Sequence, residues 1–64
     1  MYFAVYITAA GKLAVRNLHT RYESTAISEC REYRLRYDWQ AYRLFFEDGY
    51  STACVASWGE WTDE

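Results

Sequence analysis

Apolar and polar residues alternate on both sides of Asp48-Gly49. This dipeptide favours a two-residue type I′ hairpin turn, because both turn positions take a positive φ. Counting outward from such a turn gives one apolar face, made of the pairs Phe46–Ser51, Leu44–Ala53 and Tyr42–Val55. The other face is mixed and carries Arg43, Phe45, Glu47, Tyr50, Thr52 and Cys54. The pattern predicts a C-terminal hairpin with one face in the core and one toward solvent or a partner.

A second hairpin is predicted for residues 2–8 and 12–18, joined at Ala9-Ala10-Gly11, where Gly11 suits a left-handed loop position. The register that follows directs three pairs inward, Ile7–Leu13, Val5–Val15 and Phe3–Asn17. It directs the remaining side chains outward, namely Ala4, Tyr6, Thr8, Lys12, Ala14 and Arg16. Leu18 breaks the alternation, so the strand is expected to end or bulge near Asn17.

Helical spacing appears between the hairpins. Ser24 or Thr25 is expected to cap a helix that runs to about Tyr37, since a short hydroxyl accepts a free amide of the first turn. The apolar stripe of this helix would contain Ala26, Ile27, Cys30, Tyr33 and Tyr37. Glu32 and Arg36 form a favourable i,i+4 pair on the solvent side. Leu35 lies opposite the stripe, either at a frayed end or as an exposed contact residue.

These elements predict an α+β fold in ββαββ order, with one antiparallel sheet and one helix packed on one face. Residues 1–64 form a single domain without proline or repeats, and residues 59–64 are expected to be an acidic tail. The alternation does not determine the strand order. A chain of this length buries only about 60% of its unfolded surface, so its 13 aromatic rings must supply much of the core, and some of them must remain exposed.

The charge balance, 7 Lys+Arg against 9 Asp+Glu, lacks the basic excess that drives nonspecific phosphate binding. The longest apolar stretch, residues 2–10, is far shorter than the roughly 20 residues that span a bilayer. It also has no preceding basic residue typical of a signal peptide. We therefore expect a cytoplasmic protein without membrane contact.

Few residues in the sequence are candidates for catalysis or for binding a metal or phosphate. Cys30 should face the helix–sheet interface and Cys54 the other side of the sheet, so both thiols are expected to be free. His19 is the only histidine, and neither a recognisable nucleophile motif nor paired metal ligands accompany it. The isolated glycines form no phosphate loop. We expect no enzymatic activity, no metal and no cofactor.

The predicted outer sheet face combines aromatic and basic residues, namely Tyr2, Tyr6, Phe45 and Tyr50 with Lys12, Arg16 and Arg43. Tyr and Arg are typical of protein-binding hot spots, which favours a protein-binding module. The alternative is a nucleic-acid-binding sheet, since rings stack bases and arginines hold phosphates. A solvated face without a partner is the third interpretation. The residues expected to contact a partner are Tyr6, Arg16, Arg43, Phe45, Tyr50 and Trp61.

The C-terminal residues combine two tryptophans with acids. Trp58 is expected to close the core. Trp61 either anchors in a basic partner or folds back on the sheet. Open sheet edges also allow a homodimer.

The chain is short, acidic, rich in aromatic residues and free of proline, and its predicted layout contains a ββα unit. In these respects it resembles small phage-encoded proteins that disable host machinery, including polymerase inhibitors and anti-CRISPR proteins. The resemblance implies an inhibitor of a host nucleic-acid-handling protein. It rests on no motif, so it assigns no functional residue.

Overall fold

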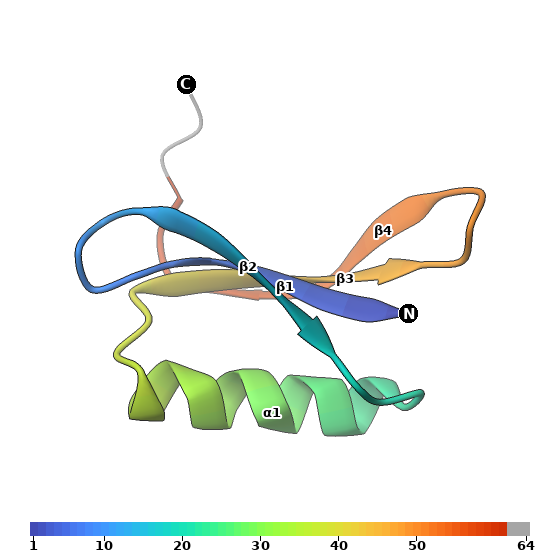
Figure 1. Ribbon diagram of the computed structural model, residues 1–64, viewed down its shortest axis with the longest axis horizontal. Coiled ribbons are helices and arrows are strands. Elements are labelled where there is room, and N and C mark those ends of the chain that lie inside the picture. The colour runs from blue at the N-terminus through green and yellow to red at the C-terminus, as the bar shows by residue number, and fades with distance from the viewer. Residues whose placement is uncertain (62–64) are drawn as a thin grey trace.

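The computed structural model describes residues 1–61 and contains four strands and one helix. The elements are β1 (Tyr2–Ile7), β2 (Leu13–Leu18), α1 (Glu23–Arg36), β3 (Ala41–Glu47) and β4 (Thr52–Trp58). The strands pair antiparallel in the order β2-β1-β3-β4, and α1 lies along one face of the sheet (Figure 1). The α+β layout in ββαββ order is therefore confirmed.

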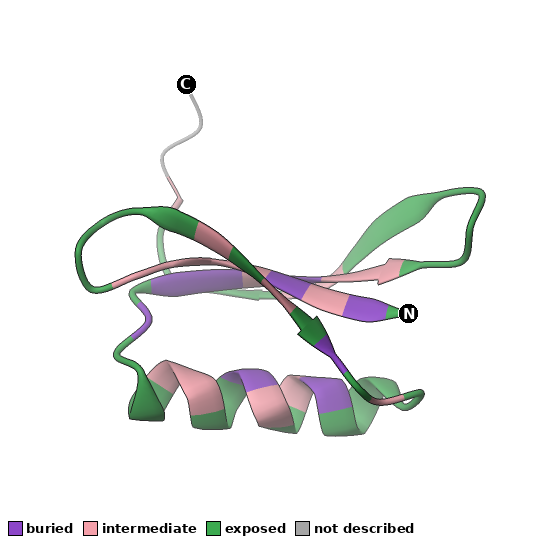
Figure 2. Cartoon of the chain, in the orientation of Figure 1, coloured by how far each residue is buried: buried purple, intermediate pink, exposed green. Residues whose placement is uncertain are grey.

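The N-terminal hairpin has the predicted register, with Ile7 opposite Leu13 and Val5 opposite Val15. Its predicted faces were wrong. Ala4 and Tyr2, expected outward, are buried on the helix side together with Leu18. Figure 2 shows buried positions along β1 and on the side of α1 that faces the sheet. The small side chain of Ala4 allows α1 to approach β1 closely. The neighbouring residues Phe3 and Val5, which point to the other face of the sheet, are bulkier. A register fixes which residues lie opposite each other, but it does not fix which face a helix will cover.

The C-terminal hairpin has a different register from the predicted one. A four-residue connection, 48–51, replaces the two-residue turn, so Phe46 pairs with Ala53, and a bulge near Leu44 then moves that residue opposite Ala56. The cause is the Asp48 side chain, whose Oδ1 accepts the amides of Tyr50 (2.8 Å) and Ser51 (2.9 Å). These hydrogen bonds, that from Ser51 first, hold the pKa of the Asp48 carboxyl below its ordinary value. The Asp48 carboxylate thus accepts hydrogen bonds from amides that would have paired with the opposite strand in a tighter turn.

The faces of β3 nevertheless match the prediction. Tyr42 and Leu44 are buried toward α1, and Arg43 and Phe45 lie on the opposite side. The two extra loop residues do not change which side chains of β4 face the helix, because side chains alternate with a period of two. The bulge does change it, since its one extra residue places Ala56, and not Val55, opposite Leu44 beside the core.

The helix begins earlier than predicted. Tyr22 is its N-cap residue and makes no side-chain capping hydrogen bond, so the expected cap at Ser24 or Thr25 was wrong. The Thr20 Oγ1 accepts the Tyr22 amide (3.2 Å) and turns the chain before those hydroxyls are reached. The predicted stripe does face the sheet, with Ala26 and Cys30 fully buried and Ile27 and Tyr33 packed beside them. Tyr37, at its end, is exposed.

The solvent side of α1 follows the sequence closely. Arg36 donates to Glu32 across 2.6 Å, which confirms the predicted i,i+4 pair. Leu35 is 75% exposed within the helix, so it is an exposed residue and not part of a frayed end.

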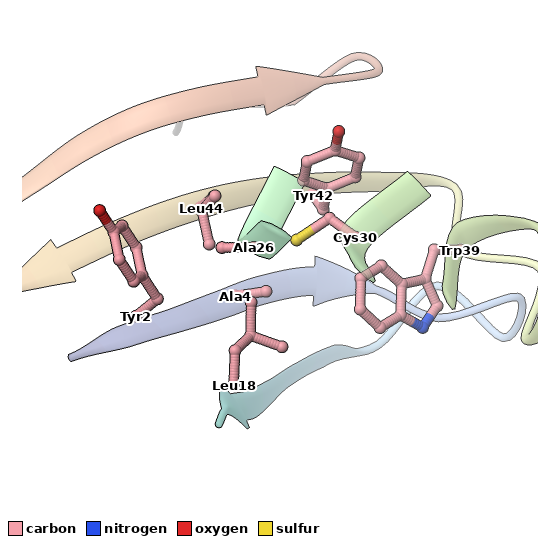
Figure 3. Packing of buried hydrophobic residues seen from close by; sticks show 8 residues of the cluster. All are labelled: Tyr2, Ala4, Leu18, Ala26, Cys30, Trp39, Tyr42 and Leu44. Atoms are coloured by element: carbon pink, nitrogen blue, oxygen red, sulfur yellow. The ribbon is translucent and has the colours of Figure 1, made fainter. Parts of the chain in front are cut away.

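Trp39, which follows the end of α1, is a core residue that the sequence analysis did not predict. Asp38 takes a left-handed conformation (φ 55°), and the Trp39 amide donates to the Arg34 carbonyl (3.0 Å), which is the 6→1 bond of a Schellman motif. This turn places Trp39, only 3% exposed, among the core side chains (Figure 3). Its ring stacks on Tyr6 with centroids 3.9 Å apart and contacts Tyr33 at 5.7 Å. The available signal was a large apolar residue two positions after the C-cap residue Tyr37, where such motifs usually place a hydrophobic contact.

Both cysteines are free, as predicted, and their environments differ sharply. Burial and the nearby Glu29 raise the pKa of the Cys30 thiol to about 11, whereas Cys54 is exposed. Because the thiolate is the reactive form, at about pH 8 we expect only Cys54 to react with a chromogenic disulfide reagent in the folded protein. Cys30 should react after denaturant is added. Native Cys54→Ser should show almost no reaction, and equal rates for both thiols in the wild type would contradict this packing.

Candidate functional site

The face of the sheet that α1 does not cover is the main candidate site. Alternation along the strands places on it the side chains that point away from the core. We call this surface the open face, and its apolar members are Phe3, Val5, Ile7, Leu13, Val15 and Phe45. Leu13 and Val15 are 68% and 63% exposed, which is high for aliphatic side chains on a regular strand. Neighbouring residues on three strands therefore form a continuous apolar surface.

Phe3 and Phe45 lie near the centre of the open face. They are directly opposite each other on β1 and β3, and their rings stack with centroids 5.3 Å apart at an interplanar angle of 17°. Both side chains are half-buried. A stacked pair of this kind is a rigid apolar platform, because each ring restricts the rotation of the other.

The chain after β4 crosses one end of the open face. Gly59 has φ 86°, and a Cβ at this position would lie 2.6 Å from the Gln40 carbonyl oxygen and 2.8 Å from Ala41 Cβ, so only glycine fits here. Beyond it, the Arg43 guanidinium lies over the Trp61 ring, 4.6 Å from its centroid. Of the two alternatives for Trp61, the structure shows the one in which it folds back on the sheet. The described part of the expected tail, residues 59–61, thus packs against the domain, and residues 62–64 lie outside the described residues.

Tyr6 and Arg16, both predicted for the outer face, lie on the helix side. The Tyr6 ring is part of the Trp39 stack, and the Arg16 guanidinium lies 4.4 Å from the Tyr33 ring centroid and 5.3 Å from that of Tyr37. The physical reason is the reversed N-terminal hairpin, which moves every residue of β1 and β2 to the opposite side. The predicted aromatic and basic outer face is consequently not assembled.

The other predicted site residues are also spread apart. Tyr50 is 98% exposed in the loop between β3 and β4 and not on a strand. Trp58, expected to close the core, stacks on the core residue Tyr42 with centroids 6.2 Å apart but is 39% exposed, and the Arg34 guanidinium lies 4.1 Å from its ring centroid. Only Arg43 and Phe45 of the predicted set occupy the strands of the open face, with Trp61 beside Arg43. Sequence reasoning missed Phe3, Val5, Ile7, Leu13 and Val15 as surface residues.

The electrostatic character of the open face is nearly neutral. Arg16, Arg34 and Arg36 interact with rings or acids on the helix side. On β1, β2 and β3, the charged residues that share the open face are Arg43 and Glu47, and Glu47 lies at the end of its strand. This surface is therefore suited to apolar contact and offers little to a phosphate backbone.

Among residues 1–61, no three His, Cys, Asp or Glu side chains come close enough to hold a metal ion. Over that range no helix has the length and apolar character needed to cross a bilayer. Comparison with protein families, curated proteins and solved structures gives no match for the chain.

Proposed function

We propose that the protein is a non-enzymatic protein-binding module whose contact surface is the open face. The observation that carries this proposal is the continuous apolar surface around the stacked Phe3–Phe45 pair, left uncovered by the single helix. An exposed apolar surface of this kind is costly in water and typically marks a protein contact. Rigid aromatic residues at its centre are also the usual energetic anchors of such contacts.

The partner surface is expected to be apolar and its rim polar. Asn17 and Glu47 lie at the margins of the open face, and Arg43 is engaged with Trp61. The near absence of charge at the centre favours a protein partner over nucleic acid. We place this activity in the cytoplasm, a proposal supported by the two free thiols. Inhibition of a host nucleic-acid-handling protein by a small phage-type protein is the form of the activity that the chain's size and composition suggest.

Capture from a lysate of the source organism tests this function. Immobilised wild type, Phe45→Ala and Leu35→Ala are compared with and without nuclease. Leu35→Ala is the control, because it truncates an exposed apolar side chain on the helix, away from the open face. Loss of a hot-spot residue costs about 2 kcal/mol or more, so Phe45→Ala should reduce recovery of a defined protein about thirtyfold. Leu35→Ala should recover it like wild type.

Circular dichroism of the same variants shows whether they remain folded. A partner retained equally by Phe45→Ala would refute the open face as the contact surface. Recovery that disappears with nuclease in every variant would instead favour the nucleic-acid-binding sheet.

A further inference from the structure

The free edge of β2 is a second feature that the fold leaves exposed. β2 pairs with β1 one residue to one across its whole length, and in residues 1–61 the sheet ends there. The Thr8 amide donates to the Lys12 carbonyl (2.8 Å), so Lys12 directs its main chain toward β1. Alternation along an antiparallel ladder then directs the amide and carbonyl groups of Leu13, Val15 and Asn17 away from the sheet. These groups form a regular row ready to pair with another strand.

The opposite edge of the sheet is different. β4 carries an extra residue where the register shifts opposite Leu44 and Phe45. A bulge in an edge strand interrupts the regular row of main-chain groups and hinders pairing with another strand. β2 has neither a bulge nor a proline. It also exposes Leu13 and Val15 beside its free main-chain groups.

We propose that β2 pairs antiparallel with β2 of a second copy of this chain about a two-fold axis at Val15. Val15 then lies opposite Val15 of the second copy, and Leu13 lies opposite Asn17. All outward main-chain groups of these three residues are used in both copies. The two sheets become one continuous sheet of eight strands, with the helices on the same side.

The charges of β2 select this register. An axis at Arg16 would bring two arginines directly opposite each other, and an axis at Ala14 would bring Lys12 opposite Arg16. Like charges directly opposite each other destabilise a strand pair. With the axis at Val15, Arg16 lies opposite Ala14 and Lys12 opposite Leu18, so no like charges lie directly opposite each other. This self-complementarity of β2 argues for a second copy and against an unrelated strand.

The main chain of β2 also favours an edge contact, because its outward amide and carbonyl groups can form hydrogen bonds with those of a second copy. These hydrogen bonds add stability to the apolar contact between the two copies. They also bring Leu13 and Val15 of both copies into one apolar row.

The contact between the two copies is made by the edge of β2 and not by the centre of the open face, so it is separate from the proposed partner-binding surface. Pairing would double the open face and present two Phe3–Phe45 platforms on one side of the dimer. It would therefore leave the proposed partner surface accessible.

Sedimentation equilibrium of wild type, Val15→Lys and Val15→Glu tests the pairing. Wild type should shift with concentration from the 7.6 kDa monomer to a species of twice that mass. Each charged variant alone should weaken the dimer about tenfold, since like charges replace the Val15 pair at the axis. An equimolar mixture of the two variants should restore it, because lysine then lies opposite glutamate. Leu35→Lys and Leu35→Glu introduce the same charges on the helix and should dimerise like wild type.

Two results would overturn the pairing. One is a wild type that stays monomeric throughout the micromolar range, and the other is charged variants that dimerise unchanged or fail to complement each other. Loss of self-association in a protein that still captures its partner through Phe45 would remove the dimer and leave the proposed function intact. A protein that dimerises but captures no partner through Phe45 would overturn the proposed function and leave the dimer intact.

Discussion

Replacing Trp39 with alanine is expected to leave most of the protein unfolded at room temperature. Trp39 connects the helix to the sheet, because its ring stacks on Tyr6 of β1 and contacts Tyr33 of α1 and Tyr42 of β3. Truncating a buried Trp costs about 3–5 kcal/mol. A domain of this size rarely has more than about 3–5 kcal/mol of stability in total. The expected loss is therefore comparable with the whole free energy of unfolding.

Far-UV circular dichroism during thermal and urea unfolding measures this effect without relying on tryptophan fluorescence. Trp39→Phe is the matched control, because it keeps an aromatic ring against Tyr6 and should cost only about 1–2 kcal/mol. A Trp39→Ala protein that melts within a few degrees of wild type would mean that the ring is not part of the core.

Leu44→Ala is expected to have the second largest effect, about 2–5 kcal/mol. Leu44 is fully buried where β3 meets α1, next to Ala26 and Cys30 (Figure 3). The truncation leaves a cavity that neighbouring small side chains cannot fill. Leu35→Ala makes the same chemical change at an exposed helix position and should alter stability by less than about 0.5 kcal/mol.

Urea unfolding at equilibrium gives both free energies on the same scale. A small difference between Leu44→Ala and Leu35→Ala would show that β3 presents its other face to the helix. That result would also exchange the open face and the core, so it bears directly on the proposed binding surface.

Much of the candidate site was not predictable because two apolar faces competed for one helix. Phe3, Val5 and Ile7 form a more apolar row than Tyr2, Ala4 and Tyr6, so the sequence pattern favoured burial of the first row. Arg16 also suggested an outward face, since an isolated arginine is usually solvated. The structure instead covers its guanidinium with the Tyr33 and Tyr37 rings, which makes burial of its stem favourable.

The length of the loop in the second hairpin was also not predictable from the local sequence pattern. Asp48-Gly49 correctly located the second hairpin, but the number of loop residues depended on which amides the Asp48 carboxylate accepts. That choice moved every pair in β4, and a separate bulge then placed Ala56 opposite Leu44 beside the core.

By itself, the sequence determined the order and type of the elements, the register of the first hairpin, the buried stripe of α1 and the separation of the two thiols. These features depend on periodicity and short-range turn chemistry, which neighbouring residues fix. Only the tertiary structure decided the strand order, the covered face of the first hairpin, the burial of Trp39 and the return of Trp61 onto Arg43. Each of these is a contact between residues distant in sequence, selected by how well side chains of different sizes fit together.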